Sequence, residues 1–340
     1  MSRGCRPGTV TVPPANKHAI PPPGDAMASP LMARVTEVTE QIIQLLARHL
    51  PGYRVRTVER LGEGQDNAAY EVNGELVIRQ SKIGDSALHG DPALHEDSAL
   101  HSDPASRAEA VRREAALLVA VSELSPLPVP QPIFVDEEAG VLAYRKLPGR
   151  PLNLHPVREP ARLAAPLGDF LSRLHAAPVE RMEAFVPRDS YPMSELLEEA
   201  EGHYRDIVAH VPAADRRMVE DFLGTAAPAE PGVLTFCHND LGSEHLLVDV
   251  EASAVTGVID WTDAAIADPA YDLALVYRDL GPEVYGRTLA HYQGRHDDAD
   301  HERVLFYARC ALLEDVAYGL CSGVRSYADA GLAHLGRTFS

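Results

Sequence analysis

The sequence is poor in positive charge and in long apolar runs. It has 31 Lys and Arg residues against 50 Asp and Glu residues, so its 340 residues carry a formal net charge of −19. An acidic surface repels nucleic acid and anionic membranes, so neither is expected as a partner. It favours a cationic ligand, or it serves only solubility. No stretch reaches the roughly 18 apolar residues that a membrane span needs, which also argues against a membrane.

Cysteine is scarce as well, and nothing in its spacing suggests a metal site. The four cysteines are far apart, and we expect free thiols in a reducing compartment: Cys5, Cys237, Cys310 and Cys321. Residues 1–30 are rich in Pro, Gly and Ala and lack the apolar core of a signal peptide. They predict a disordered tail, with the cytoplasm as the default location. Nothing in the composition indicates an oligomeric state.

Hydrophobic residues make up 45% of the chain, enough for two lobes with a sizeable core. The first lobe is predicted to be a small antiparallel sheet with two helices. Asn73-Gly74 is a strong hairpin signal between two of its strands. Apolar periodicity places helices over 31–50 and 106–124, and strands over 53–61, 68–72, 75–80, 133–135 and 141–145.

Gly62 and Gly64 lie in the turn between the first two predicted strands. Glycines let a backbone approach a phosphate closely and point its amides at it, although an ordinary hairpin turn would also contain them. No Gly-Lys-Ser/Thr follows, which excludes a Walker loop. A strand follows instead of a helix, which excludes a dinucleotide fingerprint.

Val77 and Arg79 share one face of the third predicted strand. An apolar residue two positions before a cation can offer a wall to adenine and a charge to the phosphates. The cation is Arg where Lys is usual, and its planar fork still suits phosphate; Lys82 lies just beyond the strand. Glu114, in the helix over 106–124, either pairs with Arg79 or faces solvent.

Residues 85–105 contain a six-residue unit that begins at Asp85, Asp91, Asp97 and Asp103. Each of its three full copies contains one histidine, so a metal-binding array is conceivable. A six-residue period would spread these histidines around a helix, and the unit has little to bury. A flexible insertion is therefore the preferred interpretation.

The character of the chain changes near residue 147, where a Pro- and Gly-rich connector begins at Pro148. We predict an N-terminal nucleotide-binding lobe over 31–147 and a helical lobe over 148–340. Helices are expected over 163–175, 194–211, 215–223, 283–292, 302–313 and 315–327. The helix over 194–211 is rich in acid and forms either a solvated face or a pocket wall for a cation. Glu314 and Asp315 are likewise either surface charges or residues that contact a cationic amine.

The most informative stretch is His238-Asn239-Asp240, which follows an apolar run over 233–237. His245 comes five residues later, and Asp260 ends a predicted hairpin of strands over 246–248 and 257–259. Phosphoryl transfer needs a carboxylate that orients the attacking hydroxyl and accepts its proton, together with ligands for Mg²⁺. Asp260 is a natural Mg²⁺ ligand, and a neutral imidazole can serve although oxygen is preferred. A polar loop between buried strands is the alternative.

Together these segments resemble the aminoglycoside phosphotransferase family, which has a protein-kinase-like fold. The resemblance runs from about residue 61 to 275 and rests on eight segments: 61–67, 77–79, 113–114, 144–149, 174–175, 238–245, 259–261 and 268–274. The last three segments are the specific ones. It implies an α+β, two-lobed fold with a small antiparallel-sheet N-lobe and a mainly helical C-lobe. Asp268 and Asp272 are expected to fix the catalytic loop, and His238 to shape its turn.

The resemblance also implies site residues and chemistry. Asp240 would be the catalytic base, and His245 and Asp260 would hold Mg²⁺. ATP or GTP would be bound through Gly62, Gly64, Val77, Arg79, Glu114, Tyr144 and Lys146. The expected activity is phosphorylation of a hydroxyl on a small, cationic molecule, foremost an aminoglycoside-type antibiotic, as in a resistance kinase. The alternatives are a kinase for a macrolide or a metabolite (a sugar, an amino alcohol, homoserine), or a nucleotide-binding regulator without catalysis.

Overall fold

The computed structural model describes residues 30–63, 67–82, 104–189 and 191–340. All of the predicted tail except Pro30, nearly all of the repeat insertion and Gly64 lie outside these ranges. Within them, every predicted helix and strand has a counterpart, with the changes of boundary given below.

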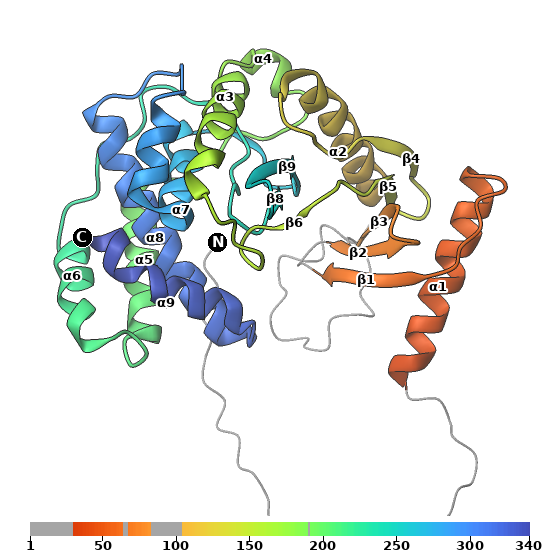
Figure 1. Cartoon of the computed structure of the whole chain (residues 1–340), viewed down its shortest axis with the longest axis horizontal. Helices are drawn as coiled ribbons and strands as arrows, with labels where there is room; N and C mark the ends of the chain where they lie inside the picture. Colours follow the sequence, from red (N-terminus) through yellow and green to blue (C-terminus); the bar gives the residue numbers. More distant parts are fainter. Residues whose placement is uncertain (1–29, 64–66, 83–103, 190) are drawn as a thin grey trace, which may run out of the picture.

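The N-lobe is built on a five-stranded antiparallel sheet with the order β1-β2-β3-β5-β4 (Figure 1). Its strands are β1 (Val58–Glu63), β2 (Asn67–Val72), β3 (Leu76–Ser81), β4 (Pro132–Asp136) and β5 (Val141–Arg145). Asn73 and Gly74 both have positive φ, +57° and +75°, as a tight hairpin turn requires. β1 begins at Val58 and not at Tyr53, because the side-chain oxygen of Asn73 accepts the Arg56 and Thr57 amides at 2.7 and 3.1 Å.

Two helices pack on this sheet. α1 (Pro30–His49) buries Ile42 and Leu46 against Ile78 and Ala143. α2 (Pro104–Leu124) belongs to a second core, which includes Leu142. Since side chains alternate along β5, Leu142 faces the side opposite to Ala143. That second core continues without interruption into the helical lobe.

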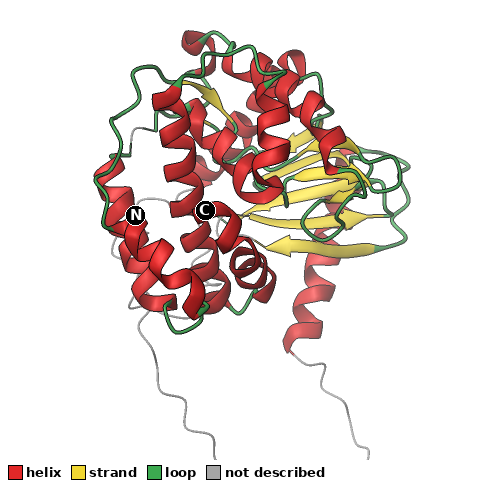
Figure 2. Cartoon of the chain, turned by 60° about the vertical axis from the view of Figure 1, so that its left-hand side comes forward, coloured by secondary structure: helices red, strands yellow, loops and turns green. Residues whose placement is uncertain are grey.

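The C-lobe is mainly helical and lies beside the sheet (Figure 2). It contains the 3₁₀ helix η3 (Pro160–Leu163) and the helices α3 (Ala164–His175), α4 (Val179–Met182), α5 (Met193–Ile207), α6 (Ala213–Leu223), α7 (Pro269–Leu289), α8 (Asp298–Ser322) and α9 (Arg325–Phe339). Helix α8 packs against α7, α9 and α5.

Three helix predictions for the C-lobe were wrong in extent. α7 starts at Pro269, capped by the Asp268 side chain, and bends at Gly281, whose φ is +84°. The helices predicted over 302–313 and 315–327 are one helix, because no residue between them breaks it; it ends at Gly323 with φ +78°. The chain was also expected to be helical from residue 275 to its end, and α9 over Arg325–Phe339 agrees with this, although no separate helix had been assigned there.

Short strands frame the centre of the molecule. β7 (Thr235–Cys237) pairs with β10 (Ala265–Ala267), and β8 (Leu246–Asp249) pairs with β9 (Ala254–Val258) and β6 (Arg150–Pro151). Neither β6 nor β10 was predicted, since runs of two and three residues carry no readable periodicity. Gly149, just before β6, has φ +105°, and a Cβ there would lie 2.1 Å from Thr256 Oγ1. Only glycine fits the connector at this point.

The expectation of free thiols holds for Cys237 and Cys310, which are both buried. It is wrong for Cys321, which is disulfide-bonded at the exposed end of α8. Among the described residues, no helix is long and apolar enough to cross a membrane.

Candidate active site

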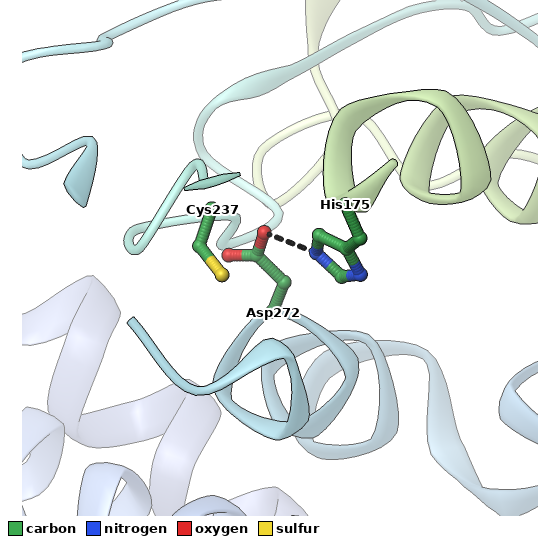
Figure 3. A group of neighbouring side chains, drawn as sticks. All are labelled: His175, Cys237 and Asp272. Carbon is green, nitrogen blue, oxygen red and sulfur yellow. Dashed lines mark hydrogen bonds and ion pairs between the residues drawn. The ribbon is translucent and has the colours of Figure 1, made fainter. Parts of the chain in front are cut away.

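The loop between β7 and β8 is held from below by Asp272 in the first turn of α7 (Figure 3). Its buried carboxylate accepts the backbone N–H groups of His238 and Asn239 at 2.9 and 2.8 Å, and His175 Nε2–H at 3.1 Å. Burial raises the pKa of Asp272, but these bonds, with His175 foremost, outweigh it and leave that pKa lowered. A charged carboxylate therefore fixes the loop, which is the structural role expected for this residue.

His238 shapes the turn of the same loop. Its Nδ1 accepts the Asp240 N–H at 3.3 Å, so its Nε2–H donates to the Ile259 carbonyl at 3.0 Å. Burial lowers the pKa of His238 to about 4, and the ring is neutral. Asn239, between them, has φ +63°, an unusual value for a residue other than glycine. The result is an Asp240 side chain that faces the space between the lobes.

Asp240, His245 and Asp260 lie together, as the spacing predicted. His245 Nδ1 is 2.8 Å from the Asp240 carbonyl oxygen and 3.3 Å from Asp240 Oδ2, while its Nε2 is 3.8 Å from Asp260 Oδ2. Burial of the Asp240 carboxyl group raises its pKa to about 7. The opposite charge of His245 opposes this effect, and the carboxylates of Glu244 and Asp263 add to it.

Arg79 on β3 reaches across to this group from the N-lobe. Its Nη1 lies 2.9 Å from Glu114 Oε1, and its Nη2 lies 3.1 Å from Asp260 Oδ1. Of the two alternatives for Glu114, the ion pair with Arg79 is therefore the one observed, and only 14% of the Glu114 side chain is exposed. The same Nη2 also donates to the hydroxyl of Thr262. For Asp260, burial raises the pKa, but Arg79 and His245 together leave it lowered.

A cavity of about 1660 Å³ extends from this group in both directions. On the N-lobe side it is lined by predicted residues, and Lys146 there also contacts Glu71. Leu247 and Ile259 add an apolar floor that the sequence had not suggested as part of a site. The predicted residues on this side are Gly62, Val77, Arg79, Tyr144 and Lys146.

On the C-lobe side the cavity is acidic. Of the acidic residues on α5, Glu199 lines it. Glu195, Glu198, Glu201 and Asp206 are exposed, so most of that face is solvated. Glu314 and Asp315 both line the cavity, and Asp315 pairs with Arg278 at 2.8 Å. The lining contains four Arg or Lys residues (Arg79, Lys146, Arg150, Arg278) against ten carboxylates: Asp189, Glu199, Glu230, Asp240, Glu244, Asp260, Asp263, Asp268, Glu314 and Asp315.

Within the part of the chain that the structure describes, two groups of side chains could hold a metal ion. In the buried group of His175, Cys237 and Asp272, the carboxylate is already used by hydrogen bonds (Figure 3). In the second group, Glu244 joins Asp240 and His245, with ligand atoms within 4.8 Å of one another. Sequence reasoning had missed Glu244, although its place directly before His245 was visible.

Solved structures with the same architecture define the class of this fold. The chain superposes on the GDP and kanamycin complex of APH(2")-IIIa with a TM-score of 0.63 and 22% identity, covering 88% of this chain and 98% of that one. It superposes on macrolide 2'-phosphotransferase MphH from Brachybacterium faecium with a TM-score of 0.55 and 22% identity, over 88% and 98% of the two chains. The fold is therefore that of the two-lobed, kinase-like antibiotic phosphotransferases, as predicted.

The family follows from the sequence itself. The profile of the phosphotransferase enzyme family matches residues 57–307, and the chain belongs to that family. It is 28% identical to viomycin phosphotransferase from Streptomyces vinaceus over 193 residues, which are 55% of this chain and 66% of that protein. The chain thus aligns with slightly less than two thirds of this curated relative.

Proposed function

We propose that the protein transfers the γ-phosphate of ATP or GTP to a hydroxyl group of a cationic small molecule, foremost an aminoglycoside-type antibiotic. The observation that carries this proposal is the meeting of Asp240, His245 and Asp260 in one cavity, with the Arg79–Glu114 ion pair beside them. Phosphoryl transfer is catalysed mainly by positioning and charge stabilisation, and this cavity provides groups for both.

Asp240 acts on the acceptor in this proposal. The acceptor hydroxyl donates a hydrogen bond to the Asp240 carboxylate, which orients the hydroxyl oxygen toward phosphorus and takes its proton as the new P–O bond forms. A general base works best when its pKa is near the working pH. The pKa of Asp240, raised to about 7 chiefly by burial, meets that condition.

His245 and Asp260 fit a Mg²⁺ ion. The Nδ1–H of His245 is used by the Asp240 carbonyl. Burial lowers the pKa of this ring, but Asp240 and Asp260 outweigh it and leave that pKa raised. Once the ring is neutral, the lone pair of Nε2 is directed toward Asp260 Oδ2, 3.8 Å away, and is available to a metal ion. A carboxylate oxygen and a neutral imidazole nitrogen on one side of the cavity can share a cation. When bound, Mg²⁺ would neutralise charge on the phosphate oxygens.

The N-lobe side of the cavity binds the nucleotide. Arg79, held by Glu114, presents a fixed guanidinium to the phosphates. Val77, Leu247 and Ile259 offer apolar surface to the base, and the connector near Tyr144 and Lys146 supplies backbone groups for its edge. Gly62 lines the same part of the cavity. Gly64, which is also proposed to bind the nucleotide, is not among the described residues. In this proposal residues 31–147 form the nucleotide-binding lobe and residues 148–340 the catalytic and substrate-binding lobe.

The acidic lining supports a polycationic acceptor over a neutral one. Ten carboxylates against four Arg or Lys residues attract protonated amines, and the aromatic side chains of Tyr271, Tyr307 and Tyr318 line the same region. The relatives described above act, by their names, on viomycin and on macrolides, and one is solved with kanamycin. A macrolide or metabolite kinase is therefore the second candidate, supported by the neighbour MphH.

A substrate panel tests the proposal. Purified protein is incubated with γ-labelled ATP or GTP and with aminoglycosides, viomycin-type peptides, macrolides, sugars, amino alcohols and homoserine. We expect labelled product with at least one polycationic antibiotic and protection of a sensitive host that expresses the protein in its cytoplasm. Label transferred only to neutral acceptors would refute the aminoglycoside assignment. Transfer to none, despite nucleotide binding, would favour a regulator without catalysis.

A further inference from the structure

Thr262 lies two residues after Asp260, in the segment between β9 and β10, and faces the cavity. Its hydroxyl donates to Asp260 Oδ1 at 2.9 Å and accepts the Nη2–H of Arg79. One hydroxyl thus bonds both to the residue proposed to hold the metal and to the residue proposed to hold the phosphates. The motifs of the sequence gave this threonine no role.

The hydrogen bond from the Thr262 hydroxyl determines which oxygen of the Asp260 carboxylate remains available. Its Oδ1 is occupied by Thr262 and Arg79, while its Oδ2 is directed toward His245 Nε2. Asp260 also has φ +61°, a left-handed conformation that is unfavourable for a residue with a Cβ. Such a conformation persists only where the surroundings over-determine it, and the Thr262 hydroxyl is one of the contacts that do so.

The hydrogen bond from Arg79 Nη2 to the Thr262 hydroxyl also gives a reason for Arg in place of Lys at position 79. The planar guanidinium places Nη1 on Glu114 and Nη2 on both Asp260 and Thr262. A lysine ammonium is a single compact charge and cannot present two separate nitrogens to these two sides. Thr262 is the additional acceptor that the second nitrogen of the fork requires.

We propose that Thr262 is a positioning residue that couples Arg79 to Asp260, and so sets the carboxylate oxygen that is free for Mg²⁺ when the nucleotide binds. This inference rests on the proposed function, because it assumes that the cavity binds a metal–nucleotide complex. It adds that the hydroxyl acts through Asp260 and Arg79, without contact with the reacting atoms.

The test compares Thr262→Val, Thr262→Ser and the wild type by calorimetric titration with ATP and with GTP at several Mg²⁺ concentrations. Loss of the hydroxyl, with its two hydrogen bonds to charged partners, is expected to weaken Mg²⁺-dependent nucleotide binding about tenfold in Thr262→Val. Thr262→Ser restores it. Thr225→Val is the matched control, because it also removes a hydrogen-bonded threonine hydroxyl, which donates to the Phe222 carbonyl at 2.6 Å away from the cavity.

A double-mutant cycle adds a readout that a merely structural role would not move. Thr262→Val in an Arg79→Lys background is expected to cost less than threefold, because the hydroxyl there keeps only its bond to Asp260 and no longer links the guanidinium to that carboxylate. Wild-type binding by a folded Thr262→Val protein, or an equal loss in Thr225→Val, would overturn the inference while leaving the proposed function intact. If the wild-type protein binds neither ATP nor GTP, both the inference about Thr262 and the proposed function are overturned.

Discussion

His245 donates its Nδ1–H to the backbone carbonyl oxygen of Asp240 over 2.8 Å. This bond fixes the tautomer of the neutral imidazole, so that Nε2, once deprotonated, is the acceptor on the side of Asp260. The backbone of a short loop therefore holds Asp240, the proposed base, and His245, the proposed metal ligand, at a fixed distance from each other.

The first prediction concerns His245 and the choice of metal. His245→Asn replaces a nitrogen ligand by an amide oxygen, which Mg²⁺ prefers. We expect transfer to persist with a lower Mg²⁺ requirement, whereas His245→Ala raises that requirement at least about tenfold. The measurement is the rate of transfer against Mg²⁺ and Mn²⁺ concentration. An unchanged metal dependence in His245→Ala would remove this residue from the metal site.

The second prediction concerns Asp240. Asp240→Asn keeps the shape of the side chain and removes its basicity, so kcat should fall by about 10²–10⁴. Nucleotide affinity should change little, because Asp240 lies on the acceptor side of the cavity. Steady-state kinetics and nucleotide titration on the same preparation separate the two effects. Turnover near that of the wild type with the true acceptor would refute the assignment as base.

The third prediction concerns the support of the loop. Asp272→Asn removes a buried charge that accepts three hydrogen bonds, from His175 and from two backbone amides. We expect a loss of about 2–4 kcal/mol in the free energy of unfolding, measured with urea. Asp221→Asn is the control, since its exposed pair with Arg217 at 3.7 Å is worth little. Equal stability of both variants would contradict the role of Asp272.

The fourth prediction concerns acid stability. The pKa of His238 in the folded protein is about 4, below the usual value, because the ring is buried. The unfolded chain therefore binds a proton between about pH 6.5 and 4 while the folded protein does not, which lowers stability as the pH falls. His238 alone should remove about 3 kcal/mol of stability across this window. Urea unfolding at pH 7, 5.5 and 4 measures it.

His238→Gln serves as the comparison for that series. It cannot gain a proton, so its stability should fall less steeply with decreasing pH than that of the wild type, whatever its stability at pH 7. Parallel pH dependence in the two proteins would show that other groups account for the acid sensitivity.

Local patterns in the sequence were sufficient for much of the fold and of the site. Alternation along β3 placed Val77 and Arg79 on one face, and both line the cavity. The spacing from Asp240 to His245 and the hairpin before Asp260 brought three polar groups together. These signals lie within one or two elements, where sequence distance limits spatial distance.

The features that were missed depend on contacts between distant elements. β10 is three residues long and exists because it pairs with β7. Asp315 meets Arg278 only because α7 and α8 pack together. Thr262 has no motif of its own, and its role is visible only once Arg79 has been placed across the cavity.

The core that joins α2 and Leu142 to the helical lobe has a consequence for how the molecule melts. Because these residues share one hydrophobic cluster with Phe170 and Trp261, loss of the C-lobe packing exposes the underside of the N-lobe sheet. Heat should therefore disrupt both lobes in one cooperative event, visible as a single calorimetric peak. For the same reason, a protease cut in the connector at Gly149 would not release two fragments able to fold alone.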